Sequence, residues 1–224
     1  MPAALPLRIA PSLLSADFAA LGEEVRAIDA AGADLIHIDV MDAHFVPGLT
    51  FGPQTVAALR GHTRKPFDVH LMVDEPHRLV DPFVRAGADI VTVHAEAGPH
   101  LHRAIATIKA LGRRAGVALN PGTPAGAIEA VIGDIDVVLV LMVDPGLPGQ
   151  TLLRSQLEKV RALRDILDAK DGRGVEVEVD GGINPETGRL AVEAGANLLV
   201  AGTAAFAGGR KAYRSNLSEL RRAA

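Results

Sequence analysis

Residues 31–40 read Ala-Gly-Ala-Asp-Leu-Ile-His-Ile-Asp-Val, and this stretch decides the fold. Gly32 can adopt the left-handed conformation that ends a helix, and the apolar run after it is typical of a buried strand. Similar phrases recur at 86–89 (Ala-Gly-Ala-Asp) and 194–197 (Ala-Gly-Ala-Asn). Each phrase predicts a helix end followed directly by a strand, so the chain contains a partial internal repeat.

Short apolar runs alternate with longer helical patterns along the rest of the chain. We expect eight strands, at residues 8–13, 34–40, 67–71, 89–94, 116–120, 137–143, 174–179 and 198–201. Helices are expected at residues 17–31, 53–60, 76–86, 100–111, 124–131, 154–169, 185–194 and 211–222. Such units pair their strands in parallel with right-handed crossovers, and eight of them can close into a barrel. The 224 residues also suit a barrel, since barrels run from about 200 to 250 residues. We therefore predict a single-domain (β/α)8 TIM barrel of the α/β class over residues 1–224; a doubly wound open sheet is the alternative.

Composition narrows the function classes. Apolar residues make up 48% and aromatic residues only 3%, which predicts an aliphatic core. The net charge of −4 argues against a nucleic-acid partner, although backbone N–H groups could still bind a phosphate. The lack of cysteine excludes disulfides and thiolate metal sites and suits a reducing cytoplasm. We see neither a secretory signal nor an apolar stretch approaching the roughly 18 residues of a membrane span. The expectation is a cytoplasmic protein with no membrane partner.

Four polar side chains are expected to meet at one rim of the barrel, because active sites of such barrels lie at the carboxyl ends of the strands. His37 and Asp39 are two residues apart and share a face of their strand. His70 ends the third expected strand, and Asp180 follows the seventh. Two imidazoles and two carboxylates suit zinc, manganese or iron(II), and a cation would offset the cost of burying two carboxylates together. The alternative is that each residue is only a hydrogen-bonded polar group at a strand end.

Three further polar residues are expected on this face, and their roles are open to several interpretations. His94 also points inward at a strand end, where it could be a fifth ligand, a substrate contact, a group behind the ligands or a structural residue. Asp68 and Glu178 lie one layer deeper than His70 and Asp180. We expect them to pair with each other, with a backbone donor or with a ligand histidine.

Glycine-bearing loops complete the rim at residues 144–150, 181–184 and 202–204. The last two follow the seventh and eighth expected strands. In barrels this is the usual phosphate site, where backbone N–H groups and a short helix start face the anion. A phosphorylated ligand is therefore expected there.

The sequence resembles ribulose-phosphate 3-epimerases. The matching segments are residues 10–17 (Ala-Pro-Ser-Leu-Leu-Ser-Ala-Asp), 37–42 (His-Ile-Asp-Val-Met-Asp), 44–47 (His-Phe-Val-Pro), 68–72 (Asp-Val-His-Leu-Met) and 179–183 (Val-Asp-Gly-Gly-Ile). They occur in the family's order, and the similarity runs from Ile9 to about Phe206. Together these motifs are specific, whereas a single glycine pair would not be.

The resemblance implies roles for individual residues. It implies that His37, Asp39, His70 and Asp180 bind one divalent metal per subunit, with zinc preferred and iron(II), manganese or cobalt possible. It implies that Asp39 and Asp180 are the two acid/base carboxylates. The implied substrate-binding residues are Ser12, His70, Gly146, Leu147, Pro148, Gly149, Gly181, Gly182, Gly202 and Thr203. Met41 and Met72 are implied to line the site. Leu141 stands where the family carries a third methionine, and the loop at 144–150 lacks the family's phenylalanine.

The implied activity is the interconversion of D-ribulose 5-phosphate and D-xylulose 5-phosphate at carbon 3, in pentose phosphate metabolism. The resemblance also implies a homo-oligomer and a ketose phosphate as the small-molecule partner. One alternative is an epimerase of another ketose phosphate, such as D-allulose 6-phosphate. Another is a non-catalytic barrel that binds a phosphate ligand, which two acid/base carboxylates disfavour. Metal-free decarboxylation would need a lysine at the strand ends, and only Lys65 lies near a strand.

Overall fold

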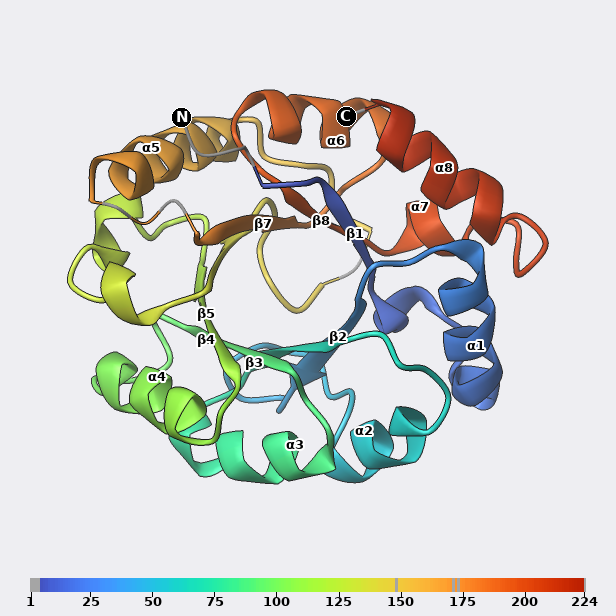
Figure 1. The fold of residues 1–224 in the computed structure, drawn as a ribbon, viewed down its shortest axis with the longest axis horizontal. Coiled ribbons are helices and arrows are strands. Elements are labelled where there is room, and N and C mark those ends of the chain that lie inside the picture. The colour runs from blue at the N-terminus through green and yellow to red at the C-terminus, as the bar shows by residue number, and fades with distance from the viewer. Residues whose placement is uncertain (1–4, 148, 171, 173, 224) are drawn as a thin grey trace.

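Eight parallel strands form a single sheet in the computed structural model, which describes residues 5–147, 149–170, 172 and 174–223. The sheet order is β1-β8-β7-β6-β5-β4-β3-β2, so neighbours in sequence are neighbours in space (Figure 1). The strands are β1 (Arg8–Pro11), β2 (Ile36–Met41), β3 (Phe67–Met72), β4 (Ile90–His94), β5 (Arg114–Leu119), β6 (Val137–Leu141), β7 (Glu176–Asp180) and β8 (Leu198–Ala201). The predicted eight-stranded barrel is confirmed, and the open doubly wound sheet is excluded.

β1 and β2 are the two edge strands of the sheet, and contacts between them close the barrel. Ser12 forms an isolated parallel bridge with His37. The N–H of Asp34 donates to the carbonyl of Ile9 at 3.0 Å, and the Asp34 carboxylate accepts from the N–H of Ile9 at 2.8 Å. Because Ser12 follows β1 directly, this closure holds it beside the polar face of β2.

Helices surround the barrel. They are α1 (Leu21–Ala31), α2 (Pro53–Arg60), α3 (Val80–Ala86), α4 (Leu101–Ala110), α5 (Ser155–Ala169), α6 (Pro185–Glu193), α7 (Thr203–Phe206) and α8 (Tyr213–Ala223). Gly32, Gly87 and Gly195 have φ between 108° and 113°, the left-handed conformation that the repeated phrases predicted. None of the helices in the described residues is long and apolar enough to span a membrane.

Three expected helices differ from the prediction. The helix expected at 124–131 is replaced by two 3-10 turns, Ala125–Ile128 and Ile132–Asp134, where Gly126 and Gly133 weaken helix formation. The helix expected at 76–86 is a 3-10 turn followed by α3, since Pro82 cannot bond back to residue 78. The helix expected at 17–31 becomes regular only at Leu21, after a 3-10 turn capped by Asp17.

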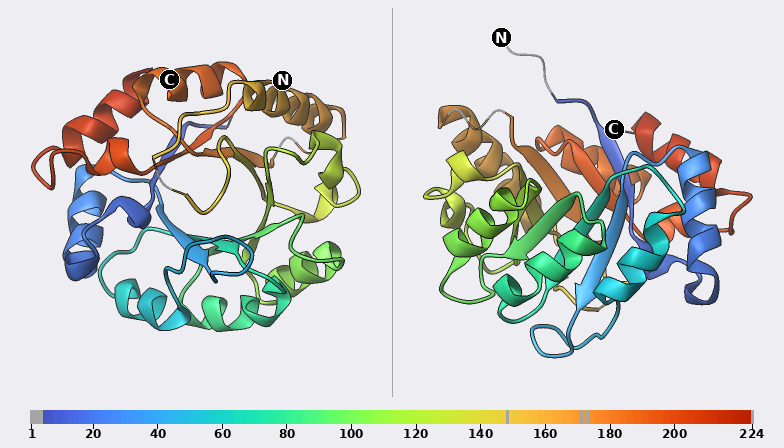
Figure 2. Two further views of the ribbon diagram at one scale, coloured as in Figure 1. Left: turned by 180° about the vertical axis from the view of Figure 1, so that it is seen from behind. Right: turned by 60° about the horizontal axis from the view of Figure 1, so that its bottom comes forward.

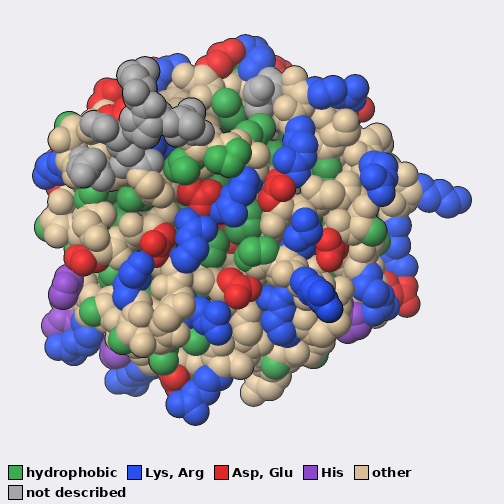
Figure 3. Space-filling view, in the orientation of Figure 1, with side chains coloured by type: hydrophobic (Ala, Val, Ile, Leu, Met, Phe, Trp, Pro, Cys, Tyr) green, Lys and Arg blue, Asp and Glu red, His purple; other side chains and the backbone are tan. Residues whose placement is uncertain are grey.

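The inside of the barrel differs chemically from its outside. Outward-facing aliphatic residues of the strands join the helices in the large hydrophobic core. One apolar cluster inside the barrel contains Ala10, Leu35, Ile90, Val137, Leu198 and Val200. On β2, β3 and β7 the inward residues are polar, whereas Ala118, Leu139 and Leu141 keep the wall at β5 and β6 apolar. Figures 1 and 3 view the end at which the strands begin, where basic and acidic side chains alternate, and the left view of Figure 2 looks onto the opposite end.

Candidate active site

The four residues predicted to form a metal site lie together at the carboxyl end of the strands. One candidate ligand atom from each of His37, Asp39, His70 and Asp180 lies within 4.8 Å of the others. The two histidines are buried beneath the rim, while Asp39 and Asp180 reach the cavity wall. The parallel pairing of β2 with β3 brings two of these residues together, because its register places Asp39 beside His70 on the adjacent strand.

The Asp39 carboxylate is at the centre of this cluster. Its Oδ1 lies 3.2 Å from His37 Nε2 and 3.1 Å from His70 Nδ1. Its Oδ2 accepts a hydrogen bond from Ser12 Oγ at 2.5 Å. Burial alone would raise the pKa of Asp39, but the two imidazoles hold that pKa well below its usual range. Asp39 is therefore ionised.

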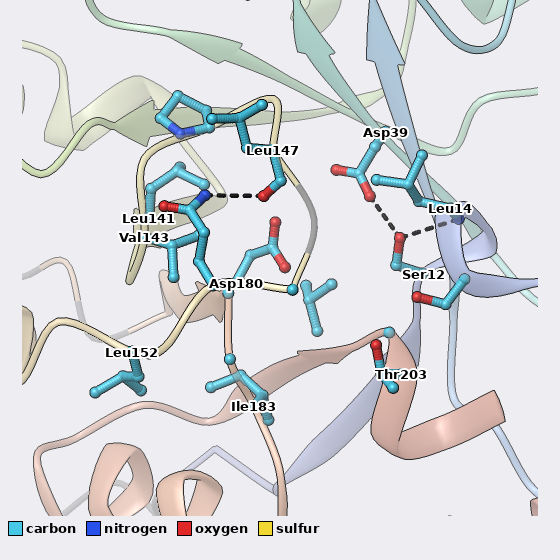
Figure 4. A pocket seen from close by; sticks show the side chains of 18 of the residues that line it. Ser12, Leu14, Asp39, Leu141, Val143, Leu147, Leu152, Asp180, Ile183 and Thr203 are labelled. Atoms are coloured by element: carbon cyan, nitrogen blue, oxygen red, sulfur yellow. Dashed lines mark hydrogen bonds between the residues drawn. The ribbon is translucent and has the colours of Figure 1, made fainter. Parts of the chain in front are cut away.

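Asp180 has the opposite tendency. Burial, followed by the nearby Asp39 carboxylate, raises the pKa of Asp180 to about 7. Figure 4 shows the carboxylates of Asp39 and Asp180 pointing toward one another across the cavity. The site thus contains one carboxylate that holds its proton near neutral pH and one that does not, which is the division of roles that an acid/base pair requires.

The second polar layer supports His37. Asp68 Oδ2 accepts from His37 Nδ1 at 2.7 Å, which confirms one of the pairings expected for Asp68. Burial and the Asp68 carboxylate raise the pKa of Glu178 well above its usual range, so Glu178 is neutral. Glu178 Oε1 lies 3.4 Å from His37 Nδ1. Burial opposes charge on His37, yet Asp39 and Asp68 raise its pKa.

A cavity of about 550 Å³ opens above the cluster. Its lining includes the following predicted residues: Ser12, Asp39, Met41, Met72, Leu141, Gly146, Leu147, Gly149, Asp180, Gly181, Gly182, Gly202 and Thr203. Pro148 lies outside the described residues. His37 and His70 are buried and do not line this cavity, and His94 lines a second, smaller cavity of about 180 Å³.

The segment after β6 extends over the carboxyl end of the barrel in the left view of Figure 2, and its residues 144–147 and 149–152 line the cavity. Gln150 Nε2 donates to the carbonyls of Asp144 at 2.6 Å and Leu147 at 2.8 Å, which holds the turn together. Gly146 has φ of 88°, and a Cβ placed there would lie 2.5 Å from Val46 Cβ. The segment therefore packs directly on the loop that follows β2.

The other end of the cavity is lined by glycines and by the start of a short helix. Gly181, Gly182 and Gly202 line it beside Thr203, the first residue of α7. The first-turn N–H groups of a helix have no acceptor within the helix, and α7 carries no side-chain cap. The start of α6 differs, because Asn184 caps it by accepting from the N–H groups of Glu186 and Thr187. The short helix start expected after the eighth strand is present.

Sequence reasoning missed several contributors. Ser15 lines the cavity near Gly202, and Thr50 supports Asp39 by donating to its carbonyl at 2.5 Å. Glu96 accepts from His94 at 3.2 Å. The spacing Val-His-Ala-Glu placed Glu96 two residues after an inward histidine, which was the available signal for that contact.

The donor set suits a divalent metal ion. The four side chains supply two imidazoles and two carboxylates, the ligands that zinc, iron(II) and manganese accept. The remote nitrogen of each imidazole already has a partner: Asp68 for His37 and His94 for His70. Metal-binding histidines in proteins are held in this way. His94 is thereby assigned behind the cluster, not as a fifth ligand.

Asp180 holds a proton, Asp39 lacks one, and the two face each other over a single cavity. Such a pair can take a proton from a carbon and return one to it. That is isomerase chemistry, and the protein is of the (β/α)8-barrel isomerase class. The chain belongs to the ribulose-phosphate 3-epimerase family, whose sequence model matches residues 8–206.

Individual relatives agree with this family. The ribulose-phosphate 3-epimerase of Bacillus subtilis (strain 168) is 52% identical over 215 residues, covering 96% of this chain and 98% of the relative. The ribulose-phosphate 3-epimerase of Rhodobacter capsulatus is 49% identical over 222 residues, covering 97% and 96%. The solved 3-hexulose-6-phosphate synthase of Salmonella typhimurium superposes with a TM-score of 0.69 over 97% of this chain and 98% of that one, at 16% identity. That last likeness shows the shared fold alone.

Proposed function

We propose that this protein interconverts D-ribulose 5-phosphate and D-xylulose 5-phosphate by moving a proton at carbon 3, with Asp39 and Asp180 as its two acid/base groups. The observation that carries the proposal is the facing pair of carboxylates with opposite pKa shifts. Family membership supports the choice of substrate, since the relatives at 49–52% identity bear this enzyme's name.

The two carboxylates divide the proton transfers between them. In one direction the ionised Asp39 removes the proton from carbon 3, and the electron pair spreads onto the neighbouring carbonyl to give an enediolate. The protonated Asp180 then delivers a proton to the other face of the same carbon. The carbon's configuration is inverted, and for the return reaction the roles are reversed.

His37, Asp39, His70 and Asp180 would hold a divalent metal ion, with zinc as our first choice. Such an ion, when bound, would act as a Lewis acid that stabilises negative charge on the substrate's oxygens. Ser12 keeps its hydrogen bond on the Asp39 oxygen that faces away from His37 and His70, so Asp39 is oriented from both sides.

The remaining walls bind the substrate and exclude water. Met41, Met72 and Leu141 supply apolar surface beside the reacting carbon, where soft thioethers pack without offering a competing proton donor. The phosphate would bind at Gly182, Gly202 and Thr203, by backbone N–H groups and the start of α7. The segment at 144–150 would cover the sugar from above.

The test is Asp180→Asn, with turnover followed in deuterated water. We expect the variant to fold and to lose epimerisation by about 100-fold to 10,000-fold, the usual contribution of a positioned acid or base. With the unmodified enzyme, product isolated after complete turnover should carry deuterium at carbon 3. Retention of the original hydrogen there, or an Asp180→Asn variant with full activity, would show that these carboxylates do not transfer the proton.

A further inference from the structure

Two side chains, those of His94 and Glu96, extend behind His70 as a hydrogen-bonded chain, and the proton-transfer chemistry does not use them directly. His70 Nε2 lies 2.8 Å from His94 Nε2, and His94 Nδ1 lies 3.2 Å from Glu96 Oε2. His70 is completely buried and His94 is 2% exposed, so no solvent competes for these contacts. The chain leads from the floor of the active site to a carboxylate near the surface.

The geometry gives the imidazoles of His70 and His94 one consistent placement of their hydrogens. His70 Nδ1 faces the carboxylate cluster, 3.1 Å from Asp39 Oδ1, so Nδ1 is the nitrogen that would bind a metal. A metal ligand needs its lone pair free, and the proton of a neutral His70 must then be on Nε2. His70 Nε2–H can donate only if His94 Nε2 accepts. The proton of His94 is then on Nδ1, from which it donates to Glu96.

We propose that His94 and Glu96 are positioning residues that hold His70 in the tautomer and orientation required for metal binding. The inference rests on the metal site proposed above. The proposed metal site thereby gains two supporting residues at the end of β4, His94 and Glu96.

The two histidines of the site are thus supported in different ways. His37 donates directly to Asp68, a buried carboxylate on the neighbouring strand. His70 reaches its carboxylate only through a second imidazole. The inserted ring is held firmly: its centroid lies 4.9 Å from that of His70 and 4.8 Å from that of Phe45. Packing therefore restricts the plane of the His94 ring in addition to its hydrogen bonds.

Glu96 is itself fixed from the opposite side. Its Oε1 accepts from the N–H of Asn120 at 2.9 Å and from the hydroxyl of Thr123. Oε2 is left for His94. The carboxylate thus joins the loop after β5 to the metal site, and two explanations of Glu96 must be separated: support of His70 through His94, and anchoring of that loop.

Four variants of the full chain separate these explanations. Glu96→Gln keeps the size of the side chain and removes its charge. His94→Leu removes both nitrogens, whereas His94→Gln keeps an acceptor near the place of Nε2. Thr123→Val is the matched control, because it removes a loop contact of Glu96 and leaves the path to His70 intact. Zinc affinity is measured by competition with a chromophoric chelator, and the state of His94 is read from ¹⁵N NMR of the zinc-loaded protein.

We expect zinc to bind about 10-fold to 100-fold more weakly to Glu96→Gln and His94→Leu, the range typical when a partner of a metal-binding histidine is lost. His94→Gln should recover part of that loss, and Thr123→Val should bind zinc like the unmodified chain. In the NMR spectrum His94 should carry its proton on Nδ1. Equal losses in Thr123→Val and Glu96→Gln, or a proton on Nε2 of His94, would overturn the inference. If His37→Ala bound zinc as tightly as the unmodified chain, the metal site itself would be wrong, which is a separate outcome.

Discussion

The contact between Gly146 and Val46 allows a quantitative test of how the segment after β6 covers the site. Gly146→Ala would introduce two separate strains. At φ of 88° the new side chain would adopt a conformation that non-glycine residues rarely take, at a cost of about 1–3 kcal/mol. Its Cβ would also lie 2.5 Å from Val46 Cβ, whereas carbon atoms pack at about 3.5–4.0 Å.

Gly149 is the matched control for the first strain. It has φ of 76°, and a Cβ placed there meets nothing within 4 Å. Gly149→Ala therefore carries the backbone cost alone. The difference between the two variants is the cost of pushing residue 146 off the β2 loop, which we place at about 1–3 kcal/mol, as for overpacked contacts in cores. At 1.4 kcal/mol per tenfold, this corresponds to roughly a 5-fold to 150-fold effect.

The assay is steady-state epimerisation of ribulose 5-phosphate, coupled to consumption of the product. We expect Gly146→Ala to lower kcat/KM more than Gly149→Ala by that factor, mainly through KM, because the displaced segment no longer covers bound substrate. Hydrogen exchange of residues 144–147 should rise in the same variant. Indistinguishable kinetics for the two variants would refute the idea that the contact between residue 146 and Val46 matters for substrate binding.

Three further predictions concern Gly202, Asp42 and Leu147. Gly202→Val should raise KM steeply with a smaller effect on kcat, because its Cβ would lie 2.6 Å from Ser15 Oγ and fill the anion end; an unchanged KM would move the phosphate elsewhere. Burial opposes charge on Asp42, but three backbone N–H groups donate to its carboxylate and lower its pKa. Ionised Asp42 therefore stabilises the folded protein at neutral pH. This stabilisation is lost as the pH falls from about 3.9, the pKa of Asp42 in the unfolded chain, through its lower pKa in the folded protein. Asp42→Asn should show a smaller loss of unfolding free energy over that range than the unmodified chain, and parallel curves would contradict this. Leu147→Phe should change the ratio of kcat/KM for ribulose 5-phosphate over allulose 6-phosphate by at most about 10-fold to 200-fold. If the unmodified protein prefers the hexulose phosphate and this substitution abolishes that preference, the substrate would be reassigned.

The strands were predictable because each one repeats a strong local pattern. The apolar run 137–141 and the alternating stretch 36–40 lie between loops rich in glycine and proline, and a barrel buries one face of each strand on helices. The helix expected between β5 and β6 was wrong because Pro124 resembles a helix start, whereas Gly126 and Gly133, which weaken helix formation, leave only two 3-10 turns there.

The four-residue cluster could be predicted for a geometric reason. Residues that end parallel strands on the inner face converge wherever the barrel closes, so His37, Asp39, His70 and Asp180 needed no distances to be grouped. The orientation of His94 was different. Whether its ring met the cavity or the back of His70 depended on one rotamer, which in turn depends on Phe45 from a distant loop. No local pattern encodes such a contact.

The polar middle of the barrel has a consequence for how robust the protein is. The carboxyl groups of Asp68 and Glu178 and the hydroxyl of Thr92 are all fully buried inside the barrel. Burying polar groups costs free energy that their hydrogen bonds must offset, so this layer stabilises the fold less than an apolar layer would. The outer shell of aliphatic strand–helix contacts must compensate. A redesign for heat tolerance would therefore do best to begin with Thr92, the uncharged member of this layer, and leave the acidic pair in place.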